Sequence, residues 1–162
     1  MNIQKIQVIV SIFTAIVTVG LSFLGFLLNK WNKKKVQMDV IKEYYKEGDS
    51  NELIQARKNI LNRKHIANEI FEYENSAYPS IVCNFFNKWG LMVKYRNLPF
   101  YIFKGSSGHG VTKCYEALKS YIDKRRVDNV LYAFHFEYLY KKIKKHNNHQ
   151  RKKKWYFMWL KK

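Results

Sequence analysis

The segment GSSGHGVTK (105–113) is the first stretch of this sequence whose residue types suggest chemistry. Glycines ahead of a helix expose backbone N–H groups that can hold a phosphate. The segment departs from the G-x-x-x-x-G-K-[ST] pattern of nucleotide-binding loops, because Val111 and Thr112 stand where that pattern requires Lys and Ser or Thr. We therefore expect a flexible connector that caps a helix starting near Gly110 and needs no ligand.

Two residue pairs are candidates for acid–base, metal or nucleophilic chemistry. His135 and Glu137 are two positions apart, so they lie on different faces of a helix and cannot converge as the histidines of H-E-x-x-H do. Cys114 and His109 lie at one helix entrance without a third group to orient the histidine. Cys114 and Cys83 lack metal or redox spacing, and we expect both to be small buried side chains. We predict no catalytic residue, no metal site and no cofactor.

An uncharged apolar run dominates the N-terminal part of the chain. The 24 residues between Lys5 and Lys30 read IQVIVSIFTAIVTVGLSFLGFLLN. As a helix they span about 36 Å, more than the roughly 30 Å hydrocarbon core of a bilayer. A secretory signal peptide has a shorter apolar region and a small-x-small cleavage site, which is missing before 29–32. The sequence predicts an uncleaved transmembrane helix over residues 6–29.

Charged residues flank this run unequally, and the imbalance predicts its orientation. Lys5 precedes the run, whereas four lysines follow it within six positions. By the positive-inside rule the N-terminus lies outside and residues 30–162 lie in the cytoplasm, which predicts a single-pass protein of the cell membrane. The residues expected at the membrane surface here are Lys30, Trp31, Lys33, Lys34 and Lys35, with the tryptophan as an interfacial anchor.

The net charge of +18 resides mainly outside the central part of the chain. All 12 acidic residues lie within 36–140, whereas 141–162 holds ten basic residues and no acidic one. A basic tail that ends in aromatic side chains suits a bilayer with anionic lipids. Alternatively, residues 155–160 fold onto the domain core or bind a partner protein. The tail residues predicted to contact the membrane are Arg151, Lys152, Lys153, Lys154, Trp155, Tyr156 and Trp159.

Small and polar residues recur every three or four positions along the apolar run. Such residues let membrane helices approach one another closely and form hydrogen bonds across the contact. Self-association into a homo-oligomer is one interpretation. The other is that each hydroxyl bonds to a preceding carbonyl of its own helix. The predicted helix–helix interface consists of Ser11, Thr14, Thr18, Ser22 and Gly25.

Apolar residues at helical spacing continue through the cytoplasmic part, which predicts an all-α fold: one N-terminal transmembrane helix followed by a small helical bundle. We expect a basic juxtamembrane helix over 30–48, a helical domain over 49–145 and a basic, aromatic tail over 146–162.

Local signals predict individual boundaries within the domain. Asp49 and Glu52 form a capping box for a helix that carries Leu53 to Leu61, and a less distinct helix follows over 66–73. A helix enters at Pro79 and ends at Gly90. A short turn begins at Pro99, and the last helices carry the apolar positions Val111, Cys114, Tyr115, Leu118, Ile122, Val130, Leu131, Phe134 and Tyr138.

Four short patterns in the second half of the chain resemble a known family. They are F-F-x-x-x-G-L (85–91), G-x-G-V (108–111), Y-I-x-x-R-R (121–126) and F-E-Y-L-Y (136–140). The chain is similar to small uncharacterised bacterial proteins in which one membrane helix precedes a helical domain of unknown function. The similarity extends over residues 6–145 and leaves out the tail from His146. It implies this architecture and carries no catalytic residue to the chain.

The sequence therefore predicts a non-enzymatic interaction module that is tethered at the cytoplasmic face. Its expected partners are anionic lipids, an unidentified protein and a second copy of the chain. A nucleic-acid-binding membrane protein that uses the basic tail is one alternative, because lysine-rich segments also bind phosphate backbones. An enzyme with an unrecognised site is the other.

Overall fold

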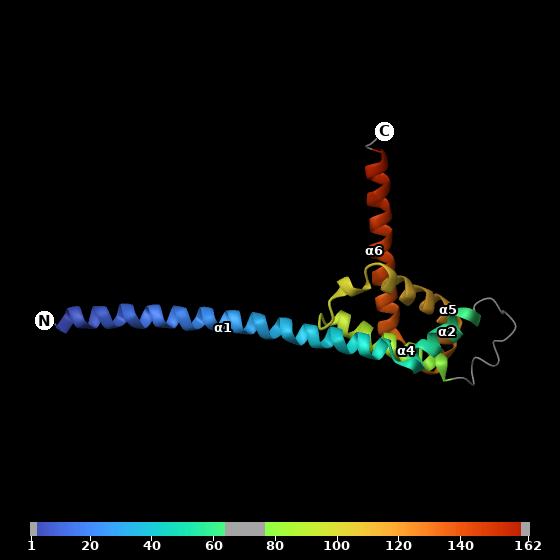
Figure 1. Cartoon of the computed structure of the whole chain (residues 1–162), viewed down its shortest axis with the longest axis horizontal. Helices are drawn as coiled ribbons and strands as arrows, with labels where there is room; N and C mark the ends of the chain where they lie inside the picture. Colours follow the sequence, from blue (N-terminus) through green and yellow to red (C-terminus); the bar gives the residue numbers. More distant parts are fainter. Residues whose placement is uncertain (1–2, 64–76, 160–162) are drawn as a thin grey trace. The chain divides into compact units, whose positions relative to one another are not determined.

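The computed structural model describes residues 3–63 and 77–159, and in this part of the chain every regular element is a helix (Figure 1). The all-α prediction is therefore confirmed. The predicted helix over 66–73 lies outside the described residues. The elements are α1 (Ile3–Gly48), α2 (Asn51–Arg63), α4 (Tyr78–Lys94), the 3-10 helix η1 (Phe100–Phe103), α5 (Ser106–Asp128) and α6 (Phe134–Trp159).

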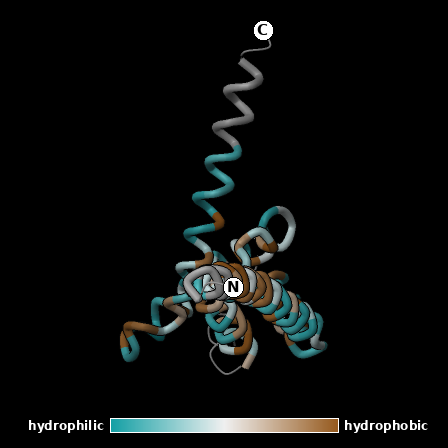
Figure 2. Tube along the Cα trace, turned by 90° about the vertical axis from the view of Figure 1, so that its left-hand side faces the viewer, coloured by the Kyte–Doolittle hydropathy of each residue, from teal (hydrophilic) through white to brown (hydrophobic). Residues whose placement is uncertain are grey.

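The chain divides into two units after Asp39. The first unit consists of the greater part of α1. The second, the helical domain, begins at Val40 and so includes the last turns of α1, which belong to the juxtamembrane helix predicted over 30–48. The basic tail predicted to begin at His146 is a continuation of α6, which extends beyond the other helices of the domain (Figure 1) and is hydrophilic over 146–150 (Figure 2).

Helix α4 forms the centre of the domain. It packs against α6 and α2, while α5 packs against α6, α2 and η1. Trp89 and Phe86 of α4 are almost fully buried, and Tyr44 from the end of α1 packs its ring near Phe85, Trp89 and Phe103 at centroid distances of 5.2–5.8 Å. Among the described residues no polar or charged residue is buried, so the core is apolar and largely aromatic.

Gly90 does not end α4, contrary to the prediction from its residue type. The helix continues to Lys94, and the chain turns only at Arg96, whose φ is 62°. A Cβ at position 90 would overlap the carbonyl oxygen of His135 on α6. The glycine therefore permits close packing of two helices, a tertiary role that local sequence signals do not reveal.

The glycine-rich segment 105–113 is likewise not a loop, because α5 begins at Ser106. Only Gly105, with a φ of 93°, takes a backbone conformation that favours glycine. Gly108 lies in the first turn, where a Cβ would overlap the carbonyl oxygen of Phe103. The segment thus closes η1 against α5, and the predicted start near Gly110 is wrong by about one turn.

Two further boundaries differ from the prediction. The cap of α2 comes from Ser50, whose Oγ accepts a hydrogen bond from the backbone N–H of Leu53 at 3.4 Å, so Asp49 does not fill this position. Val130 and Leu131 were expected on a helix stripe. They lie in the turn between α5 and α6, where 78% and 70% of their surface is exposed.

The contact at Gly90 generates a stability prediction. Gly90→Ala should lower the free energy of unfolding of the domain by about 3 kcal/mol, because the added methyl group forces α4 away from α6. Gly110→Ala is the matched control, since a Cβ there meets no atom within 4 Å and alanine favours a helix by about 1 kcal/mol. Denaturant unfolding of the two variants measures both effects. Equal stability of the two would contradict the packing role of Gly90.

Candidate interaction surfaces

The apolar side chains of α1 from Ile12 to Leu28 have no protein cover. From Ile12 to Leu28 the large apolar residues are 42–70% exposed, and none of the most apolar window is buried. Among the described helices, α1 alone is long and apolar enough to cross a membrane. A run of exposed Ile, Val, Leu and Phe is unfavourable in water and favourable in hydrocarbon, so these exposures suit a lipid environment.

Three hydroxyl groups of the polar stripe of α1 donate hydrogen bonds within the helix. Ser11 and Ser22 donate hydrogen bonds to the carbonyl oxygens four positions earlier at 2.9 Å, and Thr18 does so at 2.8 Å. Thr14 and Gly25 complete the predicted interface, and all five residues are exposed. The hydroxyl oxygens can still accept hydrogen bonds, so self-association and purely internal bonding both remain compatible with this geometry.

The juxtamembrane residues are all exposed, as a surface contact requires. Trp31 is 67% exposed and lines a shallow groove of about 350 Å³ on α1 together with Leu24, Leu27 and Leu28. The same groove includes Lys30 and Lys34, and Lys33 and Lys35 are also exposed. An indole beside aliphatic and basic side chains suits the headgroup level of a bilayer, but its contact with lipid stays a prediction.

The predicted tail contacts lie on the last turns of α6. The backbone there is helical up to Trp159, and the side chains from Arg151 onward lie outside the described part of the structure. The contacts predicted for Arg151, Lys152, Lys153, Lys154, Trp155, Tyr156 and Trp159 therefore stay predictions. The alternatives, packing on the core or binding a protein, stay open as well.

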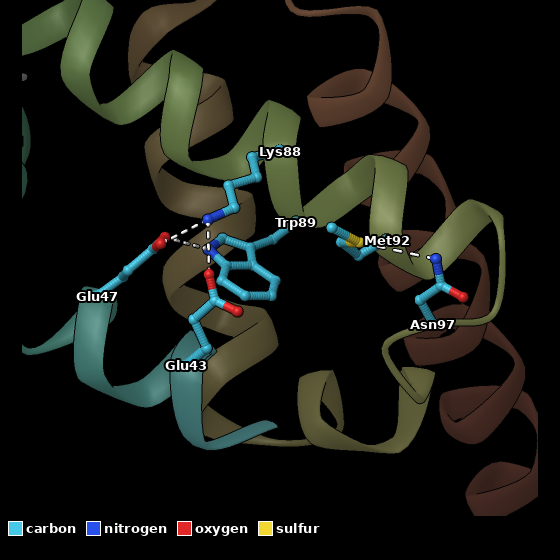
Figure 3. A network of polar contacts seen from close by, with 6 residues as sticks. All are labelled: Glu43, Glu47, Lys88, Trp89, Met92 and Asn97. Carbon is cyan, nitrogen blue, oxygen red and sulfur yellow. Dashed lines mark hydrogen bonds and ion pairs between the residues drawn. The ribbon is translucent and has the colours of Figure 1, made fainter. Parts of the chain in front are cut away.

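A polar network holds the last turns of α1 against α4 (Figure 3). Lys88 pairs with both Glu43 and Glu47, and Trp89 donates its indole N–H to Glu47 at 3.1 Å. The hydrogen bond that Lys88 donates to the Glu47 carboxylate is the main reason that the pKa of Lys88 is raised. These side chains are partly exposed, so the network fixes geometry more than it adds stability.

The start of α6 is capped by a side chain from α4. Asn87 Oδ1 accepts hydrogen bonds from the backbone N–H groups of His135 at 2.8 Å and Phe136 at 3.3 Å. An N-cap residue normally precedes its own helix in sequence. Here the position before α6 is Ala133, which has no side-chain acceptor and has a φ of 54°. The asparagine on a neighbouring helix supplies the missing acceptor.

Arg126 stabilises the turn that leads into α6 through a hydrogen bond and an ion pair. Its Nε donates to the carbonyl oxygen of Tyr132 at 2.9 Å, and its guanidinium pairs with Glu137 at 2.8 Å. Lys141 pairs with the other oxygen of the same carboxylate. The hydrogen bond from Lys141, followed by that from Arg126, holds the pKa of Glu137 below its ordinary value. Glu137 is thus an ionised structural residue.

Three of the four short sequence patterns meet at this junction. F-F-x-x-x-G-L brings Phe86 and Gly90 onto α6, and Phe86 stacks on Phe136 at 4.9 Å. Y-I-x-x-R-R ends with Arg126, and F-E-Y-L-Y contributes Phe136 and Glu137. These patterns therefore specify how α4, α5 and α6 pack.

The environments of the candidate catalytic side chains do not favour reactivity. Burial raises the pKa of the Cys83 thiol to about 12 and that of Cys114 to about 11, so both remain protonated and poorly nucleophilic near neutrality. His109 is exposed. Desolvation lowers the pKa of His135, whose Nδ1 is buried without a hydrogen bond. Within the described ranges, no three His, Cys, Asp or Glu residues form a metal-binding group.

One surface was missed by sequence reasoning. A groove of about 700 Å³ lies between η1 and the middle of α6 and is lined by Phe100 and by lysine and histidine side chains from 141–149. The basic run itself was visible in the sequence. Its proximity to Phe100, some forty positions earlier, depends on the tertiary fold and had no local signal.

Comparison with known proteins places this architecture in a described family. A family model for a domain of unknown function, DUF4760, matches residues 3–143. The match includes both α1 and the helical domain up to the middle of α6, and it ends before the last basic turns. No curated protein and no solved structure matches the chain.

The cap from Asn87 generates a second stability prediction. Asn87→Ala should cost about 1–2 kcal/mol of unfolding free energy, because two N–H groups of α6 lose their acceptor. Asn87→Asp should retain the stability, since a carboxylate accepts the same bonds and suits a helix N-terminus. The control is Asn84→Ala at an exposed position of the same helix. Thermal unfolding compares the three, and an alanine at 87 as harmless as one at 84 would contradict the cap.

Proposed function

We propose that this chain, which belongs to the DUF4760 family of domains of unknown function, is a membrane-tethered helical module that binds a partner protein at the cytoplasmic face of the cell membrane. Residues 6–29 cross the bilayer with the N-terminus outside. The domain from Val40 onward lies in the cytoplasm and acts without catalysis. The same membrane helix brings two copies of the chain together.

The main support for this proposal is that apolar side chains are buried in the helical domain but exposed in the first unit. Every described helix of the domain contributes apolar side chains to one core, in which Trp89, Leu118 and Phe136 are fully buried. In the described part of α1 before Trp31, the large apolar side chains from Ile12 to Leu28 are instead exposed. Such a helix is stable when lipid takes the place of a protein core, because all its backbone groups bond internally.

The distribution of lysines supports the orientation. Lys30, Lys33, Lys34 and Lys35 are exposed and follow the apolar run directly, and only Lys5 precedes it. Positive residues close to the end of a membrane helix favour the cytoplasmic side. This asymmetry supports a cytoplasmic domain.

The turn between α5 and α6 supports a protein partner. Val127 at the end of α5 and Val130 in the turn are 81% and 78% exposed, and Leu131 follows in the turn. Phe134 at the start of α6 and Tyr95 are also exposed, and the Lys94 ammonium lies within 6 Å of both of their ring centroids. Clustered exposed apolar side chains on a small domain commonly mark a protein contact.

Membrane insertion and orientation are tested on the full-length chain. The chain should stay with the membrane fraction after alkaline extraction. Two variants with one added cysteine each, Asn2→Cys and Ser120→Cys, should then react differently with a membrane-impermeant maleimide: the first in intact cells, the second only after permeabilisation. The native Cys83 and Cys114 are buried and give little background. Extraction of the chain into the alkaline supernatant, or labelling of position 120 in intact cells, would refute the proposal.

Self-association through α1 stays a prediction and has its own test. Thr14→Leu with Thr18→Leu should reduce dimer formation in a membrane two-hybrid assay several-fold, because bulky side chains separate the two helix backbones. Leucine substitution at Val17 and Val19, on other faces of α1, is the control and should leave the signal intact. An unaltered signal in the threonine variant would mean that these hydroxyls serve their own helix alone.

A further inference from the structure

The groove between η1 and α6 has the composition of an anion site. Its volume is about 700 Å³, and its lining includes Lys142, Lys145, His146 and His149 from α6 and Phe100 from η1. No acidic residue belongs to the lining. A concave surface with several cations and no carboxylate attracts negative charge, because the positive potentials of its side chains add.

The lysines of this groove differ in whether a carboxylate pairs with them. Lys141 pairs with Glu137, and Lys144 contacts Glu116 at 3.4 Å. Lys142 instead contacts the Tyr138 hydroxyl at 3.2 Å and lies over the Phe100 ring at 5.0 Å. For Lys145 the described residues supply no acidic partner within ion-pair distance. Lys142 and Lys145 therefore retain their full charge for an external anion.

Phe100 places an aromatic ring beside these cations. Its ring meets the His146 ring edge-on at 5.8 Å, and the neighbouring Tyr101 is 57% exposed. Aromatic rings and lysines together are typical of surfaces at the headgroup level of a bilayer. The Lys142 ammonium occupies one face of Phe100, which prevents a nucleic acid base from stacking there. This arrangement favours a lipid over a single-stranded nucleic acid.

We propose that the groove between η1 and α6 binds the phosphate groups of anionic phospholipids. The ammonium groups of Lys142 and Lys145 donate to the phosphate oxygens, and Phe100 lies against the glycerol and upper acyl region. The inference rests on the proposed function, since a membrane tether keeps the domain close to such headgroups. It places a lipid site on the folded domain, separate from the juxtamembrane lysines and from the end of α6.

The test compares two double variants with the same change in net charge. Lys142→Gln with Lys145→Gln removes the two free cations of the groove. Lys113→Gln with Lys119→Gln removes two exposed lysines of α5 that do not line it. The full chain is held in nanodiscs of phosphatidylcholine, and its binding to separate vesicles of phosphatidylcholine and phosphatidylserine is measured. A neutral nanodisc occupies α1 without supplying the anionic lipid.

The groove variant should bind these vesicles about thirtyfold more weakly, from about 1 kcal/mol for each lysine near an anionic surface. The α5 variant should bind like the unaltered chain. Equal weakening in both variants would show that only net charge matters and would overturn the site. So would an unaltered affinity of the groove variant, provided that circular dichroism shows both variants to be folded.

Additional arms identify the source of the phosphate. Inorganic phosphate and a single-stranded or duplex oligonucleotide are offered to the same nanodisc-held chain. Lysine-dependent binding of inorganic phosphate without vesicle binding would overturn the assignment to lipid, and a preference for an oligonucleotide over vesicles would do so too. Alkaline extraction separates the two proposals. A chain that stays in the membrane but ignores anionic vesicles refutes the groove alone, whereas a chain released by alkali refutes the tether whatever the groove binds.

Discussion

The close approach of α4 to the start of α6 is the contact on which the domain depends. Gly90 leaves room for the carbonyl oxygen of His135, and one turn earlier Asn87 caps the helix that this approach brings near. Phe86 and Phe136 stack because the two backbones are this close. The same junction receives Arg126 from α5, so three helices are fixed by a few side chains. The surface features of the helical domain depend on this arrangement of α4, α5 and α6.

Helix interiors could be predicted from the sequence, whereas several helix ends could not. Periodic apolar positions identified Val111, Cys114, Leu118 and Ile122 as core residues, because burial on one face of a helix imposes that spacing. Glycine was misleading, since it ends helices by local preference. Gly90 is retained inside α4 by a contact with a residue 45 positions later. The start of α2 was also misplaced. Asp49 and Ser50 are both favoured N-cap residues, so the sequence could not show which of the two caps the helix.

Among the candidate surfaces, too, one could be predicted from the sequence and another could not. The exposure of α1 and of its flanking lysines follows from an uncharged run with charged ends, so composition alone could indicate it. The groove beside Phe100 could not be predicted, because its aromatic and basic parts come from different elements. The patterns that resemble the family, such as F-E-Y-L-Y, contribute packing and ion pairs, in line with the expectation that they imply architecture and carry no catalytic residue. Strongly patterned segments of an all-helical domain reflect the demands of helix contacts at least as often as those of chemistry.

The uneven environment along α6 has a consequence for its folding. Its first half is held by the core through Phe136, Leu139 and Ile143, whereas 147–150 are exposed on all sides. An isolated helical stretch is marginal in water. The inner half of α6 is therefore stabilised by the burial of its apolar side chains, whereas 147–150 gain nothing from the core and depend on the hydrogen bonds of the helix backbone.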